Sequence, residues 1–195
     1  MTHTEKIRLN AQVFKVAACG LLEFLFLITF TTNIAMHLSG ALAGNASVSG
    51  ALSGAFSGAQ ILVGLVLGNI TCITKKYTLP VAMLSFSIGG ILLILFPSDL
   101  LMLFIGALFC GFSQGIFIPQ AMVDISNSVR PVATTMAVAC FTCATCLGQL
   151  ISPAVLNGIA KLLFGEVRTG YVYLVAVAGM TIAAIVAAIW KKGQK

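Results

Sequence analysis

The chain has 195 residues, of which 59% are hydrophobic and only 8% are charged, and its mean hydropathy is +1.06. Soluble proteins contain roughly 45–50% apolar and about 25% charged residues, so this composition excludes an ordinary soluble domain and indicates a membrane protein. The formal net charge of +6 does not indicate a nucleic-acid partner, because no run of basic residues accompanies exposed aromatic side chains.

Six apolar runs follow one another along the chain. A bilayer core about 30 Å thick is crossed by about 20 helical residues, and each run approaches or exceeds that length. The runs are Val13–Met36, Ala46–Gly68, Leu79–Phe96, Leu100–Val123, Val132–Leu156 and Gly170–Trp190. They predict an all-α membrane protein with six transmembrane helices in one domain, residues 13–190, between a polar segment at 1–12 and a basic tail at 191–195.

Lys and Arg residues are distributed unevenly between the two sides of these runs. With a cytoplasmic N-terminus, the residues on the cytoplasmic side are Lys6, Arg8, Lys15, Lys75, Lys76, Arg130, Lys191, Lys192 and Lys195. Only Lys161 and Arg168 then lie outside. By the positive-inside rule, we expect a multi-pass protein of the plasma (inner) membrane with both termini in the cytoplasm. The first run is too long for a cleaved signal peptide and is expected to be an uncleaved anchor.

The connections between the runs are short. Residues 69–78 are expected to form a loop that carries Lys75 and Lys76, and Pro80 suits the first turn of the next helix. Residues 97–99 join two antiparallel neighbours, with Ser98 or Asp99 able to cap the fourth helix. Residues 157–169 are a candidate short helix at the outer surface.

The second run contains glycine at five positions between residues 50 and 68. In lipid the backbone must satisfy its own hydrogen bonds, so a helix is expected in spite of these glycines. Gly50, Gly54 and Gly58 lie on one stripe, which is expected to let another helix approach closely. A second stripe, small and polar, contains Ser53, Ser57, Gln60 and Gly64. Helix packing alone and the lining of a cavity are both open interpretations of these stripes.

Glu23 lies near the middle of the first run, where a carboxylate costs roughly 2.5–3.5 kcal/mol on insertion scales. No Lys or Arg lies at comparable depth in any run. We therefore expect Glu23 to be largely protonated at rest, because hydrocarbon disfavours the charged form. Glu23 is a candidate for proton binding and release or for pairing with a cationic solute. The alternative is a neutral hydrogen bond that serves packing.

Polar side chains also gather on one face of the fifth run. They are Thr135, Thr142, Thr145, Gln149 and Ser152. Threonines often bond to their own helix, so internal packing is one interpretation of this face, and solute contact through Gln149 is the other. Gln114 and Gln120 on the fourth run and Asn33 on the first are further candidates for solute contact.

Cysteines occur at every third position in the fifth run, at Cys140, Cys143 and Cys146. A helix spreads three such thiols over about 120°, and neither a fourth Cys nor a His accompanies them, so we expect no metal site. His3 and His37 are expected to be too superficial to supply one. We expect no cofactor and no enzymatic activity, because a second catalytic group at the depth of Glu23 is missing.

Several segments taken in order resemble the C-terminal half of a major facilitator superfamily transporter. The segment TEKIRLNAQ leads into the first run, and GNITCITKKYTLP, Gly68–Pro80, is similar to the family's cytoplasmic loop of Gly, three residues, Asp and basic residues. Here Cys72 stands in the Asp position, and Lys75 and Lys76 are out of register. GFSQGIFIP, a loop that ends at Arg130, and LGQLISPAVLNG are similar to the tenth helix, its loop and the eleventh helix.

Family members have twelve spans in two halves that enclose the substrate. The resemblance implies that this chain is one half of a major-facilitator-type bundle, which moves a small organic solute by alternating access, with or without proton coupling. Its expected partners are the lipid bilayer, a small-molecule substrate, and a second six-helix half or a second copy of itself. Met1 before a polar segment favours a truncated or split product. The alternative function is a non-transporting helical-bundle assembly or accessory membrane protein.

Overall fold

The computed structural model describes residues 9–41 and 46–193, and all regular structure in these ranges is helical. Most of the segment at 1–12, with His3, Lys6 and Arg8, lies outside the described residues, as does Lys195. The elements are α1 (Ala11–Ala41), α2 (Ala46–Thr74), the 3-10 helix η1 (Lys75–Tyr77), α3 (Thr78–Leu95), α4 (Leu100–Ser128), α5 (Pro131–Phe164) and α6 (Thr169–Lys192).

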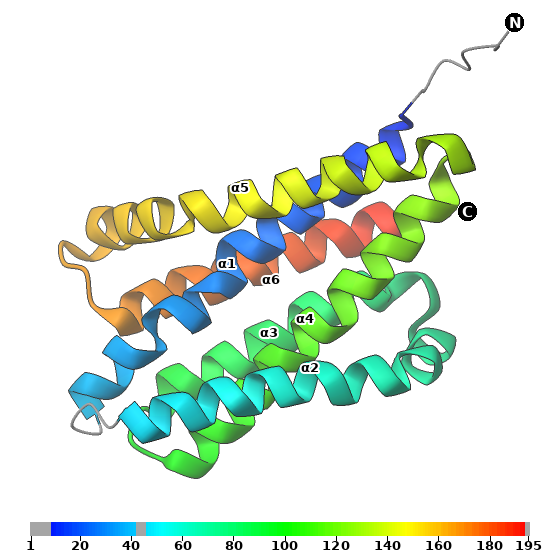
Figure 1. The fold of residues 1–195 in the computed structure, drawn as a ribbon. Coiled ribbons are helices and arrows are strands. Elements are labelled where there is room, and N and C mark those ends of the chain that lie inside the picture. Colours follow the sequence, from blue (N-terminus) through cyan, green and yellow to red (C-terminus); the bar gives the residue numbers. More distant parts are fainter. Residues whose placement is uncertain (1–8, 42–45, 194–195) are drawn as a thin grey trace, which may run out of the picture.

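Five helical stretches of the described chain are long and apolar enough to cross a membrane, judged by length and composition. One of them, Ala46–Leu95, is 50 residues long and contains both α2 and α3. The sequence predicted separate spans there, joined by a loop at 69–78. That loop is wrong, because α2 continues through Thr74 and only η1 separates it from α3. Lys75 adopts a φ of 50° at this point, and Figure 1 shows the chain reversing its direction.

Two other connections differ in how well they were predicted. Asp99 caps α4, since its carboxylate accepts hydrogen bonds from the backbone N–H groups of Leu101 at 3.0 Å and Met102 at 3.5 Å. The separate outer helix predicted in residues 157–169 is wrong, because α5 runs on through Phe164. Gly165 then ends α5 with a φ of 76°, a left-handed conformation that glycine adopts without a steric penalty.

The helices form two layers. In the first layer α5 packs on α1, α1 on α4 and α4 on α2, while α6 and α3 pair behind it and cover α1 and α4. Figure 1 looks onto the first layer, with α5 along its upper edge and α2 along its lower edge. Every packed pair of α-helices but one has a counterpart when α1, α2 and α3 are exchanged with α4, α5 and α6. The exception is the slight contact of α1 with α3, since α4 and α6 do not pack together in the described residues. The bundle therefore has an internal two-fold repeat of three helices.

Glycine permits close contacts within the first layer, between the central helices α1 and α4 and the flanking helices α5 and α2. A Cβ atom placed on Gly148 of α5 would lie 2.5 Å from the carbonyl oxygen of Leu21 on α1. Ser152, one turn further along α5, donates a hydrogen bond to the carbonyl of Leu25 at 2.5 Å. In the corresponding pair of helices, Gly111 and Gly115 of α4 face the backbone of α2 in the same way.

Polar contacts connect α6 to three different helices along its length. Thr169 at its start lies 3.3 Å from Nδ1 of His37 on α1, and Thr181 donates to Ser87 of α3 at 3.0 Å. Lys191 near its end contacts Asp124 of α4. The sequence placed Lys191 in a tail, whereas α6 continues through Lys192.

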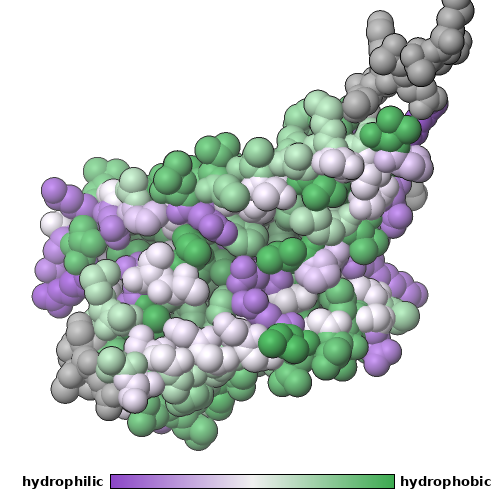
Figure 2. Space-filling view, viewed as in Figure 1, coloured by the Kyte–Doolittle hydropathy of each residue, from purple (hydrophilic) through white to green (hydrophobic). Residues whose placement is uncertain are grey.

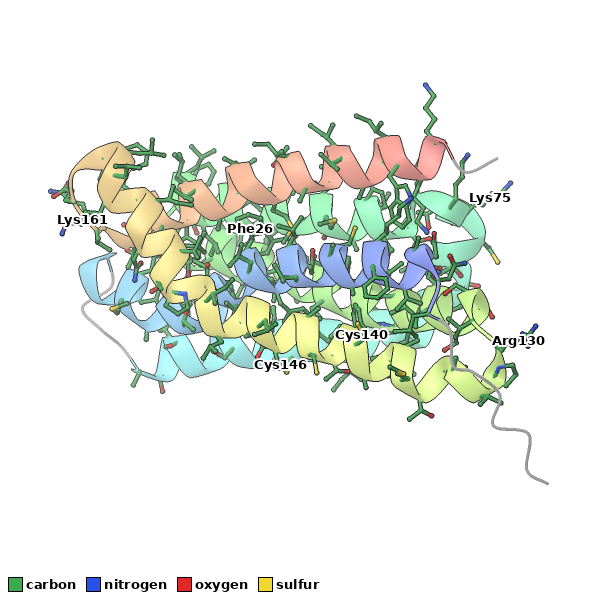
Figure 3. All side chains as sticks on the ribbon, turned by 90° about the horizontal axis from the view of Figure 1, so that it is seen from above. Phe26, Lys75, Arg130, Cys140, Cys146 and Lys161 are labelled. Atoms are coloured by element: carbon green, nitrogen blue, oxygen red, sulfur yellow. The ribbon has the colours of Figure 1, made fainter. Side chains whose placement is uncertain are left out.

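Basic residues gather at one end of the bundle. Figure 3 shows Lys75 and Arg130 at this end and Lys161 at the opposite end. We call the first end, which also carries Lys76, Lys191 and Lys192, the basic end.

Candidate functional site

Glu23 lies in the core of the bundle, between the central helices α1 and α4. It is the thirteenth residue of α1, about 18 Å along the axis from the helix start at 1.5 Å per residue. Its side chain is fully buried, and the hydroxyl of Ser113 on α4 donates to its Oε1 at 2.6 Å. Its Oε2 is also buried and has no hydrogen-bond partner among the described groups.

This environment combines a packing contact with an unsatisfied polar atom. A buried oxygen without a hydrogen bond costs free energy that a purely structural residue could avoid. Glu23 can exchange a proton at Oε2 when water reaches the site, and Ser113 can hold the carboxyl group in place meanwhile. The sequence predicted the depth of Glu23. Its packing interpretation required a hydrogen-bond partner on a neighbouring helix, and the Ser113 hydroxyl of α4 is such a partner.

Ser113 also stands within the segment GFSQG, which has the G-x-S-x-G spacing of hydrolase nucleophiles. In hydrolases that serine occupies a sharp turn from a strand to a helix. Ser113 instead lies inside the continuous helix α4 and donates its proton to a carboxyl group. The spacing therefore reflects close packing of α4, where Gly111 and Gly115 receive α2.

Two of the predicted amide side chains come together on the first layer. Nε2 of Gln60 on α2 donates to Oε1 of Gln114 on α4 at 2.8 Å. Both side chains are half-buried, and Gly115 lets the backbone of Gln60 approach α4 closely. Each amide retains hydrogen-bonding capacity on its other group, so the pair can offer both a donor and an acceptor to a solute.

The contact between these amides predicts a measurable coupling in unfolding free energy. We expect Gln60→Leu and Gln114→Leu to be non-additive by about 0.6 kcal/mol, with about 1.7 kcal/mol as the upper value for hydrogen bonds between membrane helices. Reversible unfolding of the wild type, both single variants and the double variant in detergent micelles measures this term. As a control, Gln114→Leu and Gln149→Leu should add within about 0.5 kcal/mol. Full additivity of the first pair would show that the contact has no energetic role.

The remaining predicted polar residues lie apart from this pair. Gln149 is exposed on α5, Asn33 is half-buried on α1, and Gln120 bonds to Asp124. On the polar face of α5, Thr142 donates to the carbonyl of Val138 and Thr145 to that of Thr142. These hydroxyls bond to their own helix, as the packing interpretation of that face expects.

The glycine stripe of α2 has no packed neighbour within the described chain. A Cβ atom added at Gly50, Gly54 or Gly58 would meet nothing within 4 Å. Figure 2 shows the corresponding face, where pale and purple residues run across the middle between greener edges. The close helix approach predicted for these glycines stays a prediction about a partner outside this chain. Gly68, in the predicted cytoplasmic loop, likewise lies inside α2 with open space around it.

Two features at the ends of the bundle were missed or misjudged. His37 is buried rather than superficial, because α1 continues past the predicted end at Met36 and packs His37 against α3 and α6. Its Nε2 lies 3.1 Å from the carbonyl of Leu93. At the basic end, Asp124 pairs with Lys191. The one available signal was that Asp124 directly follows the fourth apolar run and Lys191 directly follows the sixth.

The thiols of α5 line no common site. Cys140 is half-buried, whereas Cys143 and Cys146 are exposed, and Figure 3 shows Cys140 and Cys146 spread along α5. In residues 9–41 and 46–193, no three His, Cys, Asp or Glu side chains are grouped so that they could hold a metal ion.

Comparison with known proteins gives one family. The model described as Major Facilitator Superfamily matches residues 16–194, which is nearly the whole chain. Searches of curated proteins and of solved structures gave no match.

Proposed function

The chain belongs to the major facilitator superfamily, a family of membrane transporters rather than of enzymes, and from this premise we propose that it is one half of a secondary transporter. In this proposal it moves a small organic solute by alternating access, together with a second six-helix half or a second copy of itself. The length of 195 residues is consistent with one half. The observation that carries the proposal is the polar, unpartnered first layer between α2 and α5.

The proposed half crosses the membrane six times. A single helix of 50 residues would be about 75 Å long, more than twice the bilayer core of about 30 Å, so we assign two crossings to Ala46–Leu95. The turn at η1 supports this assignment. The positive-inside rule then favours a cytoplasmic location for the basic end, with both termini in the cytoplasm of a plasma (inner) membrane protein.

The proposed solute path runs over the first layer. Superfamily halves are related by an axis along the membrane normal, and each half contains a repeat of three helices in inverted orientation. The repeat of α1–α3 and α4–α6 agrees with that organisation. The second half would cover the stripe of Gly50, Gly54 and Gly58, and the Gln60–Gln114 pair would face the enclosed space. Gln149 would face it from α5.

Glu23 is the proposed coupling residue. It is the acidic group nearest the middle of the described helices, and its Oε2 has no hydrogen-bond partner among the described groups. Because Glu23 lies between α1 and α4 rather than on the first layer's surface, we assign it proton exchange rather than direct solute contact. Movement of α4 relative to α1 would change its access to water.

Thiol labelling tests the proposed solute path without knowledge of the solute. In a chain whose native cysteines are replaced by alanine, Gln60→Cys, Gln114→Cys and Gln149→Cys should each react with a membrane-impermeant maleimide from both faces of the membrane. Leu52→Cys, at a fully buried position, is the unreactive control. Alternating access predicts that either face can reach the three sites. If the assembled protein reacts from neither face, the non-transporting assembly protein is the correct alternative.

A further inference from the structure

Asp124 and Lys191 form an ion pair inside the basic end of the bundle. Nζ of Lys191 lies 2.6 Å from Oδ2 of Asp124, and the side chains are only 8% and 17% exposed, respectively. Gln120, one turn earlier on α4, donates to Oδ1 of Asp124 at 2.7 Å. The Lys191 ammonium also lies 5.1 Å from the ring centroid of Trp190. Both charged groups are therefore held by more than one neighbour.

The ion pair joins two helices that do not pack against each other. Within the described residues, no Cα atom of α4 lies within 8 Å of a Cα atom of α6. Figure 1 shows the last turns of α4 leaving α2 and running toward the end of α6 near the C-terminus. The link between these two helix ends consequently depends on long side chains rather than on backbone packing.

A proline separates the linked part of α4 from the rest of that helix. Pro119 lies inside α4 and has no N–H group, so the hydrogen bond to the carbonyl of Gly115 is missing, and helices bend at such positions. Before the proline, Gly115 packs closely against the Gln60 backbone. The segment at 120–128 is therefore the part of α4 that can change its angle, and Asp124 lies at its centre.

We propose that Asp124 and Lys191 are positioning residues for transport, because they hold the segment of α4 beyond Pro119 against α6. Release of the pair lets that segment swing away from α6 toward the solute path and closes the basic end. An exposed pair would contribute little to such an equilibrium. A buried pair makes the two positions of α4 distinct, since either partner left alone is a charge without compensation. This inference rests on the proposed transport function.

Distance measurements between spin labels test the proposal directly. One pair of labels, on Asn127→Cys and Ile189→Cys, reports the separation of α4 and α6 at the basic end. A second pair, on Leu101→Cys and Leu174→Cys, reports the opposite end. In lipid nanodiscs, Asp124→Asn should shift the first distribution to longer distances by more than its wild-type width and leave the second unchanged. The double change Asp124→Lys with Lys191→Asp should restore the wild-type distance.

The matched control is Glu166→Gln, which removes the exposed pair of Glu166 with Arg168, 2.8 Å apart with side chains 48% and 70% exposed. It should shift neither distribution. Asp124→Asn should also slow the reaction of Gln114→Cys from the basic end, whereas a purely structural pair would lower thermal stability and change neither measure. A loss of thermal stability with unchanged distances and an unchanged labelling rate would overturn the proposal.

A variant that keeps both charges covers the case in which Asp124→Asn does not fold. Gln120→Leu removes only the hydrogen bond to Asp124, and it should give a smaller shift in the same direction. An unchanged distance in Gln120→Leu would then overturn the proposal. The distances are measured without a solute, so failure of the labelling test at residues 60, 114 and 149 would reject the transport path separately.

Discussion

Gly148→Val is expected to destabilise the bundle by about 3 kcal/mol, the upper end of the usual range for overpacking. The new side chain would meet the carbonyl oxygen of Leu21 and the backbone nitrogen of Leu25, which would lie 2.5 and 3.2 Å from its Cβ atom. Backbone atoms cannot rotate out of the way, so α5 would have to move off α1. The free energy of unfolding in detergent micelles measures the effect.

Gly158→Val is the matched control, because Gly158 lies on the same helix with nothing within 4 Å of an added Cβ atom. It should change the free energy of unfolding by no more than about 0.5 kcal/mol. Equal losses in the two variants would mean that valine itself, rather than the contact with α1, is responsible. That result would contradict the packing described for α1 and α5.

Glu23→Gln is expected to abolish proton movement driven by the solute while leaving the fold intact. The amide oxygen can still accept the Ser113 hydroxyl, so packing between α1 and α4 should be retained, but the group can no longer exchange a proton. Liposomes that contain the assembled protein and a trapped pH indicator measure the effect. The wild type should acidify or alkalise the lumen when a transported member of a panel of small organic solutes is added.

Two further variants make this result specific. Ser113→Ala removes the hydrogen bond to Glu23 and should reduce the proton flux without abolishing it. Glu166→Gln changes an exposed carboxylate outside the core and should have no effect. A full proton response in Glu23→Gln would exclude Glu23 from coupling, although the solute path could still be correct.

The sequence predicted those features that depend on hydropathy and on the local chemistry of the chain. The helical class follows from the apolar runs, and the cap at Asp99 follows from one residue before a helix. The loop predicted around Lys75 was wrong because the predicted run ends at Gly68, whereas the helix continues beyond it. In the structure α2 keeps its hydrogen bonds through Thr74, and a three-residue 3-10 turn is enough to reverse the chain.

Contacts between distant residues could be anticipated only in part. Gln60 was a candidate for lining a cavity and Gln114 for contacting a solute, but 54 positions separate them. Only the packing of α2 on Gly115 brings them together. Asp124 and Lys191 were not paired, because each alone is typical of a helix end at a membrane surface. The glycines of α2 suggested close packing, whereas the close approach of α2 to another helix of this chain is made by Gly111 and Gly115 of α4.

The polar contacts of α6 restrict how freely this helix can tilt within the bundle. This helix is connected to α1 through Thr169, to α3 through Thr181 and to α4 through Lys191, so tilting it would break bonds at several depths at once. A change in the tilt of α6 would therefore have to be concerted with movements of α1, α3 and α4, so this helix couples the three mechanically.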